Sequence, residues 1–124
     1  MAKIVMIEDS KILGNALKAA LEVKGHEVIW VNDGRLGLPA VKKNKPDAVL
    51  LDLMLPHISG FEICKAIKSD AAIYKTPVII MSRLTGAQDI EKANEAGATH
   101  FIGKPYDLQA TLAEINKFLP RKGV

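Results

Sequence analysis

The sequence has little cysteine, few aromatic residues and no long apolar run, and these shortages exclude several classes of protein. Cys64 is the only cysteine among 124 residues, so the chain forms no internal disulfide. A chain without disulfides fits a reducing compartment, and we expect a cytoplasmic protein. No stretch approaches the roughly 20 apolar residues that span a membrane, and no charged and then apolar leader opens the chain. We therefore expect no membrane partner.

Charge of one sign is not concentrated anywhere along the chain. Basic residues outnumber acidic ones by 17 to 14, and the net charge is +3. The one dense group, Lys42, Lys43 and Lys45, is more typical of a solvated helix end than of a nucleic-acid site. We therefore expect no direct contact with nucleic acid.

The length and the apolar content fit one domain with a substantial core. The chain has 124 residues, and 48% of them are apolar. It contains no repeat, low-complexity tract or linker. We expect a single domain over residues 1–124, with no output domain.

Five short apolar runs alternate with stretches of helical periodicity. Such runs predict strands that are buried on both faces. They cover residues 3–7, 28–31, 48–52, 78–81 and 100–103. Strict alternation with helices predicts an α/β fold, with a doubly wound five-stranded parallel sheet and helices on both faces.

Polar residues mark the starts of four of the helices. These residues are Ser10, Ser59, Thr85 and Asp107. Residues 59–62 and 85–88 match the capping-box pattern. The helix after the second strand has weak signals, and we expect it to begin late, with Pro39 in its first turn.

Four of the five predicted strands end in a polar side chain. Glu8 and Asp9 follow the first, Asp52 ends the third, Ser82 ends the fourth and Lys104 follows the fifth. Parallel strands share one carboxyl edge, where ligands bind in open α/β sheets. Asp52 alone could be a solvated acid at a strand end, but the polar residues at the ends of the other strands favour a ligand-binding site. Since the reference pKa of aspartate is about 3.9, we expect Asp52 to be ionised at pH 7.

These residue types together suit phosphoryl transfer. In the strand order 2-1-3-4-5 the first and third strands are neighbours, so Glu8, Asp9 and Asp52 would converge. Three carboxylates repel one another unless a cation joins them, and oxygen ligands with open water positions suit Mg²⁺. Lys104 and Ser82 could contact phosphoryl oxygens. A carboxylate can itself be the nucleophile.

The pattern resembles the receiver domain of response regulators in two-component signalling. The resemblance covers essentially the whole chain, and its motifs occur in the family's order. The residues that carry it are Glu8-Asp9-Ser10, Asp52 with Met54 and Pro56, Gly60, Ser82, and Phe101 before Lys104-Pro105. It implies a flavodoxin-like sheet of order 2-1-3-4-5.

The resemblance also implies an activity for the site. Asp52 would accept a phosphoryl group from a phosphohistidine on a histidine kinase or phosphotransfer protein. Asp9, Asp52 and the backbone carbonyl of Met54 would bind Mg²⁺, with Glu8 helping through water. Lys104 and Ser82 would contact the phosphoryl oxygens. The protein would catalyse only its own phosphorylation and dephosphorylation, so it would not be an enzyme in the usual sense.

A switch is implied as well. Phe101 would change rotamer when Ser82 moves inward, and a surface on the fourth helix, fifth strand and fifth helix would bind a downstream target protein. We expect a stand-alone receiver. Arg83 departs from the family, because a small residue is common at this position. Phe101 lacks the hydroxyl group that a tyrosine would carry.

Three other classes share parts of this pattern. A phosphatase with an aspartyl nucleophile would need a second acid two residues after Asp52, where Met54 stands. A flavin-binding module would need a phosphate loop after the first strand, where Glu8 and Asp9 would repel the phosphate. A receiver that works without phosphorylation usually lacks a key acid or the lysine, and this chain keeps them.

Trp30 and the three histidines are not part of the predicted site. We expect Trp30 to pack on the sheet. His26, His57 and His100 show no metal-ligand spacing, and we expect them on the surface.

Overall fold

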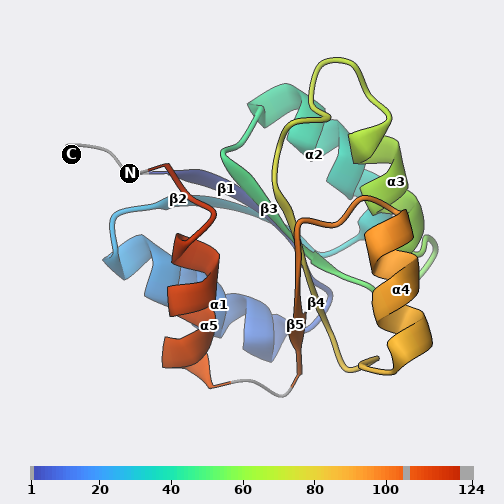
Figure 1. The fold of residues 1–124 in the computed structure, drawn as a ribbon. Helices are drawn as coiled ribbons and strands as arrows, with labels where there is room; N and C mark the ends of the chain where they lie inside the picture. The colour runs from blue at the N-terminus through green and yellow to red at the C-terminus, as the bar shows by residue number, and fades with distance from the viewer. Residues whose placement is uncertain (1, 105–106, 121–124) are drawn as a thin grey trace.

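The computed structural model describes residues 2–104 and 107–120, and strands and helices alternate along them (Figure 1). The elements are β1 (Lys3–Ile7), α1 (Lys11–Val23), β2 (Glu27–Val31), a 3₁₀ turn (Gly34–Leu36), α2 (Gly37–Asn44), β3 (Ala48–Asp52), α3 (Gly60–Lys68), β4 (Val78–Ser82), α4 (Ala87–Glu95), β5 (His100–Gly103) and α5 (Leu108–Asn116). Within the described ranges, no helix combines the length and the apolar character that crossing a membrane requires.

The five strands form one parallel sheet in the order β2-β1-β3-β4-β5. This confirms the predicted fold class and strand order. The strand β2 begins at Glu27, one residue earlier than predicted, because the Glu27 amide donates a 2.9 Å hydrogen bond to the Ala2 carbonyl. The strands β1 and β3 lie side by side, so the two strands that end in acids are neighbours.

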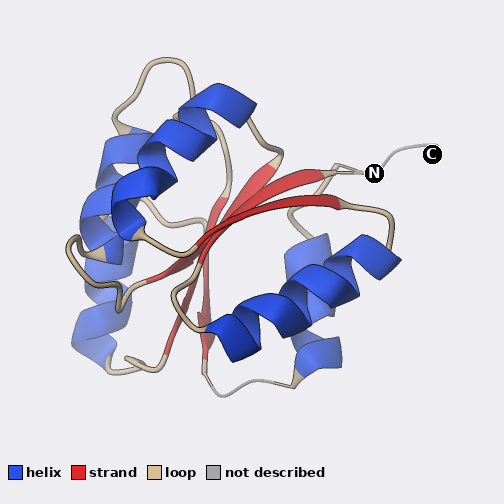
Figure 2. Cartoon of the chain, turned by 180° about the vertical axis from the view of Figure 1, so that it is seen from behind, coloured by secondary structure: helices blue, strands red, loops and turns tan. Residues whose placement is uncertain are grey.

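Helices cover both faces of the sheet (Figures 1 and 2). The sheet separates two layers of buried apolar side chains. Alternate residues of each strand point to opposite layers. Ile4 and Met6 pack toward α1 and α5, whereas Val5 and Ile7 pack toward α2, α3 and α4. All four are at most 1% exposed, as unbroken apolar runs predict. Each side chain of this kind stabilises the fold by about 1.5–3 kcal/mol when it is fully buried.

Three of the four predicted helix caps are present. The Ser10 hydroxyl accepts a hydrogen bond from the Leu13 amide, and the Ser59 hydroxyl accepts one from the Phe61 amide. The Asp107 carboxylate accepts from two amides of the first turn of α5. These bonds satisfy backbone donors that have no partner within a helix.

The fourth predicted cap was wrong. The helix α4 begins at Ala87, and its N-cap is Gly86, which makes no side-chain hydrogen bond. The methyl group of Thr85 instead lies so close to β5 that a Cβ at Gly103 would be 2.9 Å from it. This packing holds Thr85 outside the first turn of the helix. The prediction for α2 is confirmed, since Pro39 lies in its first turn.

Of the three histidines, only His57 is exposed as predicted. His26 is half-buried because its Nδ1 accepts a 3.0 Å hydrogen bond from the Ala2 amide. His100 is half-buried because its ring packs against Phe118, and its Nε2 lies 3.0 Å from a carboxylate oxygen of Glu114.

Candidate functional site

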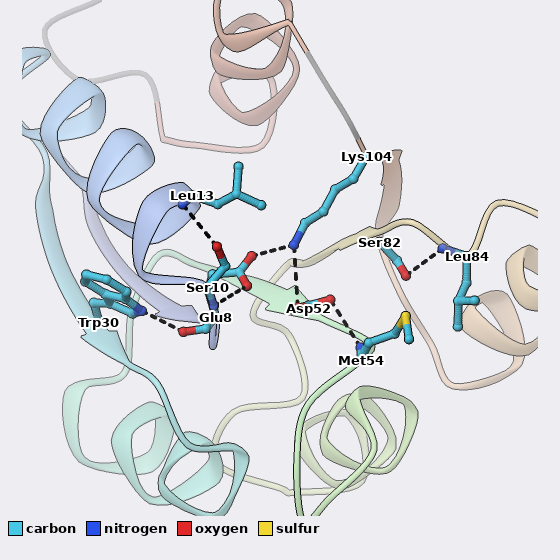
Figure 3. Close-up of polar contacts among 9 residues, drawn as sticks. All are labelled: Glu8, Ser10, Leu13, Trp30, Asp52, Met54, Ser82, Leu84 and Lys104. Carbon is cyan, nitrogen blue, oxygen red and sulfur yellow. Dashed lines mark hydrogen bonds and ion pairs between the residues drawn. The ribbon is translucent and has the colours of Figure 1, made fainter.

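The carboxyl edge of the sheet brings the polar strand ends together around a cleft of about 220 Å³. Figure 3 shows Glu8, Asp52, Ser82 and Lys104 gathered where β1, β3, β4 and β5 end. The residues that line the cleft are Glu8, Asp9, Ser10, Leu13, Asp52, Met54, Arg83 and Lys104. Five of the predicted site residues, Glu8, Asp9, Asp52, Met54 and Lys104, therefore line one cavity, and Ser82 and Phe101 lie outside its lining.

Three carboxylates converge in the cleft, as predicted. Glu8, Asp9 and Asp52 each place a carboxylate oxygen within 4.8 Å of the other two. Glu8 and Asp52 are only 3% and 6% exposed, whereas Asp9 is exposed. A cluster of three carboxylates with one open side fits a hard divalent cation such as Mg²⁺, which prefers oxygen ligands and retains waters.

Lys104 supplies the positive charge of the cluster. Its Nζ lies 2.6 Å from Glu8 Oε1 and 3.5 Å from Asp52 Oδ2, and its side chain is 5% exposed. Its backbone amide donates a 2.7 Å hydrogen bond to the Ser82 carbonyl, which ties the end of β5 to β4. Removing Glu8 or Lys104 would strongly destabilise the protein, because the remaining member of their buried pair would lose its compensation. Pro105, the other half of the predicted Lys104-Pro105 motif, lies outside the described residues.

Glu8 has partners for both of its carboxylate oxygens. Oε1 accepts from Lys104, and Oε2 accepts a 3.0 Å hydrogen bond from the Ser10 amide. We predicted that Glu8 would help to hold a cation through water. In this arrangement Glu8 also fixes the position of Lys104, a role that the sequence did not suggest.

Asp52 is less acidic than the sequence led us to expect. Burial, and after it the nearby charge of Glu8, raise its pKa to about 7, against the opposing effects of Lys104 and a hydrogen bond from the Met54 amide. That hydrogen bond to Asp52 Oδ1 is 3.1 Å long. A group with a pKa near 7 is about half protonated at pH 7, so the expectation of full ionisation was wrong for this arrangement.

The predicted switch residues lie on neighbouring strands. The buried Ser82 hydroxyl accepts a 3.0 Å hydrogen bond from the Leu84 amide, and a hydroxyl can also donate its own proton. Phe101 is half-buried and packs against the apolar layer under α2, α3 and α4. Arg83 is exposed and lines the same cleft as Asp52.

The contacts that Trp30 and Gly14 make near the site were not predicted from the sequence. The indole nitrogen of Trp30 donates a 2.8 Å hydrogen bond to the Glu8 carbonyl. At Gly14, within α1, a Cβ would lie 2.1 Å from the Trp30 ring. One signal was available in the sequence, because a glycine inside a helical pattern costs about 1 kcal/mol relative to alanine and indicates a packing reason.

A family model for the response regulator receiver domain matches residues 4–116. The chain belongs to the response regulator receiver family. The match covers most of the chain and includes every residue of the cleft. The resemblance seen in the sequence is thereby confirmed at the level of the family.

Relatives and solved structures agree with this assignment. The receiver is 36% identical to the response regulator ArlR of Staphylococcus saprophyticus subsp. saprophyticus, over 98% of this chain and 54% of that relative. The chemotaxis response regulator CheY4 of Vibrio cholerae has a TM-score of 0.90 and 27% identity, over 96% of this chain and 99% of that one. The non-phosphorylated HemR receiver domain of Leptospira biflexa has a TM-score of 0.88 and 29% identity, over 100% of both chains. The receiver spans about half the length of the curated relatives that it matches.

Proposed function

We propose that this receiver accepts a phosphoryl group on Asp52 from a phosphohistidine of a histidine kinase or phosphotransfer protein. The observation that carries the proposal is the placement of Asp52. It ends a buried strand, and its carboxylate lies 3.5 Å from the Lys104 ammonium beside two further acids. Few structural roles require a buried aspartate beside a lysine and two further acids.

The transfer is a substitution at phosphorus. The ionised carboxylate of Asp52 forms a bond from oxygen to phosphorus, and the bond from phosphorus to the donor's imidazole nitrogen breaks, with its electron pair left on that nitrogen. Asp52 must be deprotonated to attack, and its pKa of about 7 permits this at neutral pH. The Met54 amide, bonded to Asp52 Oδ1, helps to orient the carboxylate.

Mg²⁺ is the cofactor that fits the cluster. Asp9, Asp52 and the backbone carbonyl of Met54 would hold it, and Glu8 would contribute through water. When bound, Mg²⁺ neutralises charge that develops on the transferred group. Lys104 and the Ser82 hydroxyl would hold the remaining phosphoryl oxygens, because one is a buried cation and the other is a buried hydroxyl that can donate its proton.

Phosphorylation would then shift an existing equilibrium between two states. In the phosphorylated state the Ser82 hydroxyl leaves the Leu84 amide for the new anion, and Phe101 turns into the space that this movement opens. The surface of α4, β5 and α5 would thereby gain affinity for a target protein. Chemical shifts should change from Asp52 to β5 and α4 on phosphorylation, and changes confined to the loop after Asp52 would contradict the switch.

Three broader expectations stay predictions. They are a stand-alone receiver without an output domain, a cytoplasmic location and a protein rather than a nucleic acid as the direct target. The intact mass of the protein from its source cells, fractionation of those cells and co-purification of the phosphorylated form with its target would test them in turn.

The decisive experiment concerns the acceptor. Incubation with acetyl phosphate and Mg²⁺ should add one phosphoryl group to the protein, as measured by intact mass. Asp52→Asn should gain none, whereas Asp33→Asn, a matched change at a half-buried acid outside the cleft, should be modified like the wild type. An unmodified wild type or a modified Asp52→Asn variant would refute the assignment.

A further inference from the structure

Trp30, on the edge strand β2, contacts the backbone that carries the acids of the site. Its indole nitrogen donates a 2.8 Å hydrogen bond to the Glu8 carbonyl oxygen (Figure 3). The Glu8 amide in turn donates a 3.1 Å hydrogen bond to the Val31 carbonyl. Both backbone polar groups of Glu8 are therefore held from β2.

The hydrogen bond from Trp30 fixes a peptide plane, and through it the position of Asp9. The Glu8 carbonyl and the Asp9 amide belong to one planar peptide unit. Because the Asp9 side chain is exposed, the direction of its carboxylate follows mainly from the backbone that carries it. Beyond Asp9 the chain is held again, since Ser10 caps α1. Trp30 thus fixes the start of the loop between β1 and α1, which is the part of the loop that carries Glu8 and Asp9.

Gly14 makes room for the indole inside α1. A Cβ at Gly14 would lie 2.1 Å from Trp30 Cζ2 and 2.5 Å from Cε2, which is closer than atoms can approach. The indole therefore lies directly against the helix backbone. A side chain at position 14 would push the ring away and break its hydrogen bond to Glu8.

We propose that Trp30 is a positioning residue for the metal-binding acids, and that Gly14 is what allows it to reach them. The inference rests on the proposed function, because it concerns the same acid cluster. Trp30 touches no reacting group and acts only through the peptide that joins Glu8 to Asp9. Loss of the hydrogen bond from Trp30 should lower the affinity for a divalent cation by more than the accompanying loss of fold stability would explain.

Titration of the protein with Mg²⁺, followed by NMR, tests this directly. Trp30→Phe keeps an aromatic ring but removes the N–H donor, and it should weaken Mg²⁺ binding about fivefold, the order of effect of one neutral hydrogen bond. Gly14→Ala keeps the donor but displaces it, and it should weaken binding in the same direction. The double variant should bind no more weakly than Trp30→Phe alone, because the donor is already absent and the smaller ring leaves space at position 14.

Val28→Ala is the matched control. Val28 lies on the same strand and packs in the same apolar layer as Trp30, and it lines no part of the cleft. This variant should unfold at lower urea concentration than the wild type and yet bind Mg²⁺ with unchanged affinity. Urea unfolding of every variant shows that each is folded under the conditions of the titration.

The outcomes separate the two hypotheses. A wild type that binds no Mg²⁺ contradicts the proposed function, and the positioning role falls with it. A wild type that binds Mg²⁺ while Trp30→Phe binds equally well overturns the positioning role alone. Weaker binding by Val28→Ala would also overturn it, because affinity would then simply follow stability.

Discussion

Replacing Asp52 with asparagine should stabilise the protein when no divalent cation is present. The ionised Asp52 carboxylate is buried beside Glu8, and Lys104, which could compensate it, is closer to Glu8. Asparagine has nearly the same shape and can still accept the hydrogen bond from the Met54 amide. The change therefore removes a buried negative charge at little cost in packing.

The magnitude follows from the pKa of Asp52, which rises from 3.8 to about 7 on folding. An acid whose pKa is raised in the fold binds more protons in the folded than in the unfolded state between those two values. Its contribution is therefore zero below about pH 4, and stability is lost progressively as the pH rises to about 7. Above that, the loss corresponds to about 4 kcal/mol. Because Asp52 and Glu8 share one lysine, we expect Asp52→Asn to raise the free energy of unfolding by about 2–4 kcal/mol at about pH 8.

Urea unfolding in the presence of a chelator, followed by circular dichroism, measures this difference. The difference between Asp52→Asn and wild type should shrink at about pH 5, where wild-type Asp52 is protonated, and also on addition of Mg²⁺. Asp33→Asn is the control, because Arg35 lowers the pKa of the Asp33 carboxyl to about 2, so its loss should not stabilise the protein. An Asp52→Asn variant that is no more stable than wild type at about pH 8, or a difference that does not depend on pH, would refute the reasoning.

Three further predictions concern the cleft and its walls. Arg83→Ala should shorten the lifetime of the phosphorylated form several-fold and leave Mg²⁺ affinity unchanged, because the guanidinium lines the cleft and obstructs the attacking water. The decay after removal of the phosphodonor measures this, and an unchanged or longer lifetime contradicts it. Asp9→Ala should abolish Mg²⁺ binding in an NMR titration, and unchanged affinity would exclude Asp9 as a ligand. Gly60→Ala should lower the free energy of unfolding by about 1–3 kcal/mol in urea. Its Cβ would lie 2.4 Å from the Asp52 carbonyl oxygen, whereas Gly86→Ala, whose Cβ would meet only the end of one side chain, should have little effect. Equal stability of these two glycine variants would show that the close approach at Gly60 is not required.

The strands could be predicted because their signal is local. Residues 48–51 are apolar without alternation, which is the pattern of a strand covered by helices on both faces, and the structure buries all of them. The capping prediction at Thr85 failed because a contact distant in sequence decides its position. The methyl group of Thr85 packs over Gly103, and no pattern within residues 85–88 contains that information.

The meeting of Glu8, Asp52 and Lys104 at one edge was also predictable, because parallel strands bring their carboxyl ends to one edge. The protonation behaviour of Asp52 in this site was not predictable. The pKa of Asp52 depends on how deeply it is buried and on its distance from Glu8, and neither follows from residue types. The hydrogen bond from Trp30 to Glu8 was missed for the same reason, since it depends on a ring that crosses from β2 to the loop after β1.

The ion pair between Glu8 and Lys104 joins residues 96 positions apart, and this separation bears on how the protein is made. A ribosome completes β1, β3 and β4 before it adds β5, so the acids exist before their cation does. Burying Glu8 and Asp52 without Lys104 would cost several kcal/mol, so the acidic edge must stay hydrated until the last strand docks. The contact between Glu8 and Lys104 forms late, because closing the long loop between them costs conformational entropy before the contact can compensate for that cost. The buried pair of Glu8 and Lys104 therefore forms only after β5 has been added, and the closed cleft depends on the complete sheet.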